Sequence, residues 1–354
     1  MAEYDTMKFA CLVEKGKAEV RERPLGPVGD CDVVIKQLAC NICTTDYTQW
    51  QGHREHQGYP MAGGHEGSGI VVAVGPEVKS IRVGDFVAHS TTGCGQCRAC
   101  AVGDYYNCEN TLGIAATTED GYRGGQFGFA NYAKIHARAC YRMDPTLDPA
   151  EAGFLEPVAT ATHAAETLAV HPGETVVVIG GGTMGLVNAQ VARTYGARVI
   201  VSELQPHKLE KAKELGLEVI DSKNNDPIEK AMEMTGGKGA DSVIVAVGLT
   251  LAYDQALKMV KNKDGKIMFF ASGHPEPELH VSPNSIHYRR LQLLGSMNAT
   301  QADYAVAAKL INNRLVNVKA LIDPVRYPLS RIQEAFAAAD GNKYRVSVTL
   351  QEDE

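Results

Sequence analysis

The chain has 354 residues, of which 44% are hydrophobic and 22% are charged, and its formal net charge is −7 at pH 7. At roughly 150 residues per domain this length suggests two domains, and the composition is that of a globular protein. The negative charge argues against nucleic acid or an anionic membrane as a partner, because both favour a basic surface.

Two further observations concern location. No apolar run approaches the roughly 18–20 residues that span a bilayer. The first segment, "MAEYDTMKFACLVEKGK", has early acidic residues and no long apolar core, unlike a signal peptide. We therefore expect a cytoplasmic protein, in which the nine cysteines are thiols or metal ligands before they are disulfides.

Residues 7–150 have the pattern of short strands broken by glycine and proline. "DVVIKQLAC" (32–40) and "GIVVAVG" (69–75) are compact β-rich runs bounded by turn residues. This pattern predicts an all-β module with tight turns rather than a helical one.

Three segments carry a mixed set of possible metal ligands. Cysteine, histidine and carboxylate are typical of a catalytic zinc site, which uses three protein ligands and keeps one position open. Each alone is weak, because a lone histidine is more often a satisfied side chain and a lone cysteine a core residue. The segments "NICTTD", "GGHEGSG" and "FLEPVAT" supply the ligand candidates Cys43, His65, Glu66 and Glu156. The first segment also supplies Thr45 and Asp46 beside the cysteine.

A second cluster, "GCGQCRACAVGDYYNC" (93–108), has the spacing C-x2-C-x2-C-x7-C. Disulfides between cysteines three positions apart would close small strained rings. Four thiolates instead suit a closed, structural Zn²⁺ site. The predicted ligands are Cys94, Cys97, Cys100 and Cys108.

The pattern changes near Pro172. Apolar runs alternate with amphipathic stretches, such as "QPHKLEKAKELG" (205–216) and "LAYDQALKMVKN" (251–262). We count six candidate strands between 174 and 296. Strands alternating with helices predict a parallel sheet with helices on both faces, which makes the chain an α/β protein.

The first turn of this region, "VVVIGGGTMG", has G-x-G-x-x-G spacing between a strand and a helix, which favours a dinucleotide site. Glu203 follows at the end of the next strand, where a carboxylate accepts hydrogen bonds from a ribose 2′-hydroxyl and repels a 2′-phosphate. NAD is therefore favoured over NADP, although His207 and Lys208 lie nearby. The predicted cofactor-binding residues are Gly180, Gly182, Thr183, Met184, Gly185, Glu203 and Lys208.

The last segment, 297–354, is too short to bury a core of its own. It contains one expected helix around 303–313, another around 330–339 and a strand-like "YRVSVTL" (344–350). We expect it to return and complete the N-terminal module, so that the dinucleotide-binding region is an insertion.

Taken with these motifs, the chain resembles the zinc-dependent medium-chain alcohol dehydrogenases. The family motif G-H-E-x2-G-x5-G-x2-V is matched in full by Gly64, His65, Glu66, Gly69, Gly75 and Val78. The resemblance implies a GroES-like catalytic domain (1–157, with a structural-zinc lobe at 93–109), a Rossmann domain (158–296) and a C-terminal part that completes the catalytic domain (297–354). It also implies an active site in the cleft between the domains, two zinc ions per chain, NAD, a small alcohol or ketone substrate and a homodimer or homotetramer.

The resemblance also implies roles for single residues. Cys43, His65 and Glu156 would ligate the catalytic zinc, with Glu66 beside them as a direct or exchanging ligand. Asp46 would hydrogen-bond the ring of His65, and Thr45 would pass the alcohol proton outward.

"LEP", with a carboxylate at the third ligand, resembles the polyol dehydrogenase branch and indicates oxidation of a polyol, sugar or sugar derivative. A hydroxy-amino acid or a simple secondary alcohol is the alternative substrate. A non-catalytic zinc-binding relative is a further reading, but such chains tend to lose the ligands that this one retains.

Two positions depart from the family pattern. Thr44 follows the catalytic cysteine, where glycine is common, and Thr48 stands where many members have the outer histidine of the proton relay. Proton exit could then use water, or His53 or His56, although an exposed-loop role for these histidines is favoured.

Tyr47, Trp50 and Asn298 are candidates for the substrate pocket, with packing roles equally open.

Overall fold

The structure is a computed structural model that describes residues 4–54, 57–90, 93–105, 107–110, 118, 120–124, 126–340 and 342–351. The chain forms two compact units. Unit 1 comprises Met1–Glu156, Thr300–Asn313 and Leu321–Glu354, and unit 2 comprises Pro157–Ala299 and Arg314–Ala320.

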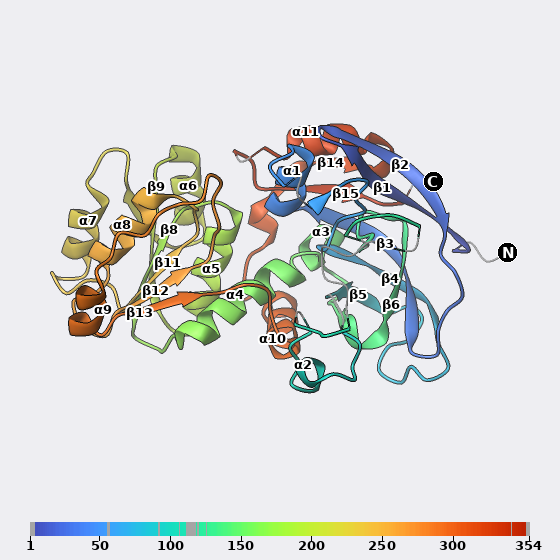
Figure 1. Cartoon of the computed structure of the whole chain (residues 1–354), viewed down its shortest axis with the longest axis horizontal. Helices are drawn as coiled ribbons and strands as arrows, with labels where there is room; N and C mark the ends of the chain where they lie inside the picture. The colour runs from blue at the N-terminus through green and yellow to red at the C-terminus, as the bar shows by residue number, and fades with distance from the viewer. Residues whose placement is uncertain are drawn as a thin grey trace. The chain divides into compact units, whose positions relative to one another are not determined.

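Unit 2 contains one parallel sheet of six strands in the order β10-β9-β8-β11-β12-β13 (Figure 1). This confirms the predicted α/β class and the six expected strands. The order reverses between β8 and β11, and ligands of open α/β sheets bind at such switch points. The strands are β8 (Thr175–Ile179), β9 (Arg198–Glu203), β10 (Glu218–Asp221), β11 (Ser242–Val245), β12 (Lys266–Phe269) and β13 (Gln292–Gly295).

Helices cover the sheet of unit 2 because its central strands are apolar on both faces. β8 and β11, for example, are almost entirely buried, as expected for parallel strands. Two short helices were not predicted, although each begins with a capping residue followed by proline, Asp226-Pro227 and Ser282-Pro283. The helices are α5 (Thr183–Thr194), α6 (Pro206–Glu214), α7 (Pro227–Met234), α8 (Thr250–Met259) and α9 (Pro283–Arg289), together with most of α4 (Leu155–Leu168).

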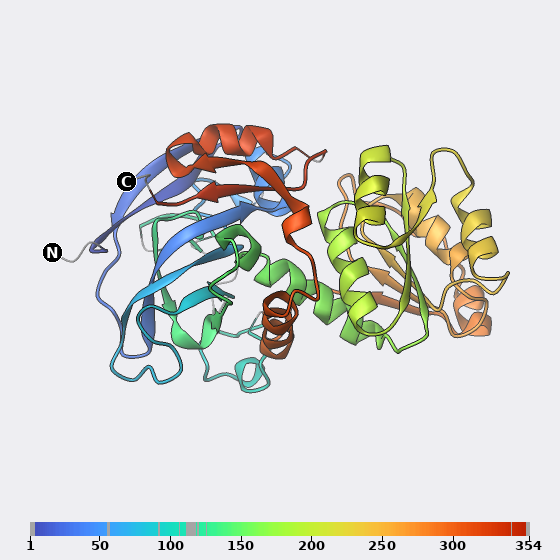
Figure 2. The ribbon, with the colours of Figure 1, turned by 180° about the vertical axis from the view of Figure 1, so that it is seen from behind.

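Unit 1 is built on a seven-stranded sheet and a two-stranded hairpin. The sheet has the order β14-β15-β3-β4-β5-β7, with β6 paired to β3, and β1 pairs with β2. The C-terminal strand β15 runs antiparallel to β3, so the end of the chain belongs to the same sheet as β3, β4 and β5 (Figure 2). The strands are β1 (Thr6–Glu14), β2 (Lys17–Pro24), β3 (Asp32–Ile42), β4 (Gly67–Val74), β5 (Phe86–His89), β6 (Tyr132–His136), β7 (Cys140–Arg142), β14 (Ile322–Pro328) and β15 (Arg345–Thr349).

The N-terminal part of unit 1 is not all-β, which corrects the sequence prediction. The threonine-rich segment after β3 has strand-like composition, but it forms a helix because a capping box closes its first turn. The helices of unit 1 are α1 (Thr44–Trp50), α2 (Arg98–Ala101), α3 (Pro149–Ala152), α10 (Gln301–Asn312) and α11 (Ile332–Ala338). Among the described residues, no helix is long and apolar enough to cross a membrane.

Candidate metal centres and coenzyme turn

Helix α1 begins at Cys43, which is a candidate metal ligand and also the N-cap. Its Sγ accepts a hydrogen bond from the backbone N–H of Asp46 (3.3 Å), and the Asp46 carboxylate accepts one from the backbone N–H of Cys43 (3.1 Å). This reciprocal capping fixes the position of the thiol relative to the helix.

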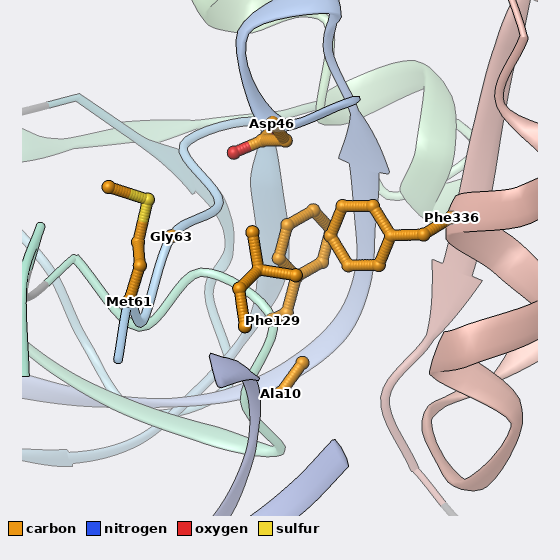
Figure 3. A pocket seen from close by; sticks show the side chains of 7 residues that line it. Ala10, Asp46, Met61, Gly63, Phe129 and Phe336 are labelled. Atoms are coloured by element: carbon orange, nitrogen blue, oxygen red, sulfur yellow. The ribbon is translucent and has the colours of Figure 1, made fainter. Parts of the chain in front are cut away.

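Asp46 also accepts a hydrogen bond from the backbone N–H of Gly64 (3.2 Å), beside His65. The family resemblance implies a hydrogen bond between Asp46 and the imidazole of His65. The hydrogen bonds that Asp46 makes within the described structure go instead to two backbone amides. The Asp46 side chain also borders a small, mainly apolar recess (Figure 3) and is buried. That recess is lined by Ala10, Leu12, Met61, Gly63, Phe129 and Phe336 as well as Asp46.

The mixed ligand candidates come together around His65. Possible ligand atoms of Cys43, Asp46 and His65 lie within 4.8 Å of one another, as do those of His65, Glu66 and Glu156. Sulfur, nitrogen and oxygen donors at this spacing are the combination that Zn²⁺ takes in proteins. The residues therefore fit a zinc ion.

Buried polar side chains position the segment that carries Glu156. Asn41 of β3 donates from Nδ2 to the carbonyl of Ala150 (3.0 Å), and Ser68 of β4 donates to the carbonyl of Pro149 (2.6 Å). Both contacts tie α3 to the sheet, five to six residues before the start of α4, whose first turn contains Glu156.

The two carboxylates next to His65 have different surroundings. Glu66 is fully buried and paired with Arg345, whose Nη2 and Nε lie 2.7 and 2.9 Å from its two oxygens. Burial raises the pKa of Glu66 to about 7, although Arg345 acts to lower it. Glu156 is half-buried, and the charge of Arg345 reaches it as well. Within the described structure the Arg345 guanidinium hydrogen-bonds Glu66, so the carboxylate of Glu156 is the less engaged of the two.

The charges around His65 also favour a cation. Burial alone would lower the pKa of the His65 imidazole, but Cys43, Asp46 and Glu156 outweigh it and raise that pKa well above its usual value. A divalent ion would relieve the same excess of negative charge.

A stacked pair of tyrosines lies near the proposed metal ligands, and one of the two, Tyr304, interacts with the charge of Glu156. Tyr304 of α10 is buried and stacks on Tyr141 (ring centroids 5.6 Å apart). Burial, followed by the nearby Glu156 carboxylate, raises the pKa of Tyr304 well above its usual value. Tyr141 in turn hydrogen-bonds Gln301, whose backbone N–H reaches the carbonyl of Gly103 in the four-cysteine lobe (3.3 Å).

Thr45, the predicted proton carrier, is half-buried on α1. Thr48 donates its hydroxyl to the carbonyl of Thr44 (2.8 Å) and accepts a hydrogen bond from Nε of Arg54 (3.1 Å). His53 is exposed, and His56 lies outside the described residues.

Of the pocket candidates, Trp50 stacks on Tyr47 and on Phe336 of the core, and Asn298 has a left-handed backbone (φ 60°).

The four cysteines of the second cluster converge as the sequence predicts, with their sulfurs within 4.8 Å of one another. The Sγ–Sγ distance is 4.0 Å for Cys94 and Cys100 and 3.9 Å for Cys97 and Cys108. A tetrahedral site with Zn–S bonds of about 2.3 Å needs sulfurs about 3.8 Å apart, whereas a disulfide needs about 2.0 Å. The geometry therefore fits zinc and not disulfides.

Amide groups surround these sulfurs. Backbone N–H groups of Gln96, Cys100 and Asn110 lie 3.4–3.5 Å from the sulfurs of Cys94, Cys97 and Cys108. The side-chain amide of Asn110 lies 3.3 Å from Cys94 and lowers the pKa of that thiol. Such donors stabilise thiolates, the form that binds metal.

In unit 2, the glycine turn links β8 to α5. Gly180 has φ 107°, which favours glycine, and a Cβ on Gly185 would lie 1.9 Å from the carbonyl oxygen of Gly180. A Cβ on Gly182 would meet no described atom within 4 Å, so the chain's own packing does not require glycine there. Close approach of a ligand would explain it. Thr183 and Met184 form the first turn of α5.

Glu203, at the end of β9, lies beside this turn. Its Oε2 accepts a hydrogen bond from the backbone N–H of Gly181 (2.6 Å), and Oε1 accepts from Leu204 and Gln205 (2.7 and 2.9 Å). The Glu203 carboxylate is therefore held next to the glycine turn. Lys208, the other residue predicted to bind the coenzyme here, is half-buried in the first turn of α6.

Comparison with known families agrees with this geometry. Residues 29–145 match the alcohol dehydrogenase GroES-like domain, and residues 183–313 match the zinc-binding dehydrogenase domain. The chain belongs to the zinc-dependent medium-chain dehydrogenase family. It is therefore an oxidoreductase, with zinc and a nicotinamide coenzyme as its cofactors.

Several relatives cover nearly the whole chain. It is similar to a sorbitol dehydrogenase of Halalkalibacterium halodurans (32% identity, covering 94% of this chain and 96% of the relative) and to a D-arabitol-phosphate dehydrogenase of Enterococcus avium (30%; 92% and 92%). An L-threonine 3-dehydrogenase of Bacillus velezensis is 33% identical (90% and 91%). Among solved structures, a putative zinc-binding dehydrogenase from Sinorhizobium meliloti bound to NADP has a TM-score of 0.84 (28% identity; 97% and 99%).

Proposed function

We propose that this enzyme uses NAD(H) and zinc to interconvert a secondary alcohol and a ketone in a polyol, sugar or sugar derivative. The observation that carries the proposal is the thiolate, imidazole and carboxylate set around His65, in a chain that also has a Rossmann sheet and glycine turn. The sorbitol and D-arabitol-phosphate relatives support the substrate class.

Cys43, His65 and Glu156 would hold the catalytic zinc, and Cys94, Cys97, Cys100 and Cys108 the structural zinc, giving two ions per chain. Zinc at the first site supplies Lewis acidity, which lowers the pKa of an alcohol hydroxyl. Glu66 would act mainly by balancing charge, because Arg345 engages both of its oxygens.

The chain's own residues would then position the substrate and move the proton. Thr45 would accept the hydroxyl proton on the half-buried side of α1 and release it outward. Asp46 would accept hydrogen bonds from the backbone amides of Cys43 and Gly64, which keeps the Cys43 thiol and the neighbouring His65 at a fixed distance from each other.

For the coenzyme, we infer that residues 158–296 form the binding domain and that the N-terminus of α5 receives the pyrophosphate. The space at Gly182 supports this placement. Glu203 supports NAD rather than NADP, since its carboxylate would repel a 2′-phosphate and accept ribose hydroxyls. Fluorescence titration with NADH and NADPH tests this, and equal affinity would contradict it.

A hydroxy-amino acid is the second candidate substrate, because an L-threonine 3-dehydrogenase is as similar to this chain as the polyol enzymes are. The carboxylate ligand Glu156 favours the polyol reading, since the resemblance associates threonine dehydrogenases with aspartate at that position.

The first test combines metal analysis with a substrate panel. Purified protein is assayed for zinc content and then incubated with NAD⁺ and polyols, sugars, sugar phosphates, β-hydroxy amino acids and simple secondary alcohols, while NADH absorbance is followed. We expect about two zinc ions per chain and turnover of polyhydroxy compounds. Two zinc ions with turnover of L-threonine alone would reject the polyol assignment.

Two further parts of the proposal concern the state of the protein. The homodimer or homotetramer that the family resemblance implies is tested by light scattering after size-exclusion chromatography. The separation of the four sulfurs of the cysteine lobe supports a reducing, cytoplasmic location.

A further inference from the structure

The outward side of α1 is lined with hydroxyl groups. Asp46 and Gln49 are the buried residues of this helix, whereas Thr44 is exposed and Thr45 and Thr48 are half-buried. Residues three and four positions apart share one side of a helix, so these threonines form a polar face. That face begins next to Cys43, the N-cap and proposed zinc ligand.

Arg54 is attached to the far end of this face. Its Nε donates to the hydroxyl of Thr48 (3.1 Å), and the loop closes onto the helix through a hydrogen bond from the backbone N–H of His53 to the carbonyl of Thr48 (2.9 Å). A guanidinium has five N–H donors in a rigid fork. Within the described part of the chain, only its Nε has a hydrogen-bond acceptor, which leaves the terminal nitrogens available.

The position of Arg54 suits one end of an extended substrate. Thr48 follows Cys43 by five residues, which is about 7–8 Å along a helix. A sugar acid or sugar phosphate whose reacting carbon lies at the zinc site can cover that span with its charged end. The hydroxyls of Thr44 and Thr45, which have no other partner in the described structure, lie along the same side for the substrate's own hydroxyls.

Arg54 differs from the other charged groups near the proposed zinc site in its ability to bind an anion. Asp46, Glu66 and Glu156 are acidic, and the guanidinium of Arg345 is buried and engaged by Glu66. Arg345 is therefore not available to an anionic substrate, whereas the terminal nitrogens of the half-buried Arg54 have no acceptor among the described residues.

We propose that Arg54 binds the carboxylate or phosphate of an anionic polyol derivative, and that the enzyme prefers such a substrate to a neutral polyol. This inference rests on the proposed function and narrows its substrate class. The pyrophosphate of the coenzyme offers the same chemistry, so the experiment must separate the two sources.

The test uses the zinc-loaded, full-length enzyme and three variants. Arg54→Gln removes the charge, Arg54→Lys restores a charge without the fork, and Arg82→Gln removes an exposed arginine from the turn before β5 as a matched control. Each protein is assayed with two pairs of compounds, a hexitol with its aldonate and a pentitol with its phosphate. Binding of inorganic phosphate is followed separately by thermal shift at constant ionic strength, and NADH binding by fluorescence.

We expect the wild type to favour the anionic member of at least one pair. Arg54→Gln should lower kcat/KM for that anion by about 10- to 100-fold, as for the loss of a charged hydrogen bond, with less than about a twofold change for the neutral partner. Arg54→Lys should recover part of the loss, and Arg82→Gln should behave as wild type. Stabilisation by phosphate should also disappear in Arg54→Gln alone.

Other outcomes overturn the inference or separate it from the proposed function. An unchanged preference in Arg54→Gln, or a wild type that favours neutral polyols, would reject the anion site. A weaker NADH affinity with an unchanged substrate preference would assign Arg54 to the coenzyme instead. If no polyol is turned over but phosphate stabilises the wild type and not Arg54→Gln, the anion site stands and the proposed function falls.

Discussion

Replacing His89 with glutamine should make the free energy of unfolding less sensitive to acid. His89 lies in β5 and is only 7% exposed, with Nε2 3.2 Å from Oε1 of Gln37. The side-chain amide of Gln37 donates to the carbonyls of Phe127 and Ala130 (3.2 and 2.7 Å). Because the amide nitrogen of Gln37 is used in this way, its side-chain oxygen faces His89. The Nε2 of the neutral His89 ring then donates a hydrogen bond to that oxygen.

The size of the effect follows from the pKa. Burial, with a smaller contribution from His65, lowers the pKa of His89 from 6.5 to about 4. Between these values the unfolded chain binds a proton that the folded chain does not, so stability is fully present above pH 6.5 and falls as the pH drops toward 4. The complete loss is about 3 kcal/mol, of which about 2 kcal/mol is lost between pH 7 and pH 5.

Urea denaturation at pH 7, 6 and 5 measures this loss. Glutamine at position 89 can still donate to Gln37, so the variant should fold, and the free energy of unfolding should fall less steeply with acid by about 2 kcal/mol. Subtracting the two curves cancels acid effects common to both proteins, such as metal release. His53→Gln, in an exposed loop, is the control and should follow the wild type. Parallel curves for His89→Gln and wild type would refute the reasoning.

Three further predictions concern the metal sites and the buried ion pair. Cys43→Ala should lower turnover by about 100-fold or more and cost only about 1 kcal/mol of stability, through loss of the α1 cap, whereas Cys97→Ser should lower the unfolding midpoint further; full activity in Cys43→Ala would contradict the proposed metal chemistry. Gly93→Ala places a Cβ 2.4 Å from the sulfur of Cys100, so elemental analysis should find about one zinc fewer per chain. Arg345→Met should destabilise by about 3–5 kcal/mol at pH 8 because it leaves a buried carboxylate unpaired. That loss should be smaller at pH 6, where protonation neutralises the carboxylate, and a pH-independent loss would count against this reason.

Local patterns explain the parts of the fold that the sequence predicted. The strands of unit 2 are continuous apolar runs between turn residues, and such runs are read directly as buried parallel strands. The four sulfurs of the cysteine lobe come from fifteen consecutive residues, Cys94 to Cys108, so their spacing alone restricts how they can meet. The helix α1 was missed because its cap is a cysteine, which lies outside the usual capping residues.

Long-range pairings account for what the sequence did not predict. Glu66 and Glu156 are both carboxylates near His65 in the family pattern, and nothing in the sequence distinguishes their availability. Arg345 makes that distinction, but it is 279 positions away from Glu66 and meets it because β15 pairs with β3, which also pairs with β4. The same sheet holds Glu156 in reach through Asn41 and Ser68. The family resemblance thus points to the residues proposed to bind zinc, whereas the pairing of strands that are far apart in the sequence explains why Glu66 forms the salt bridge with Arg345.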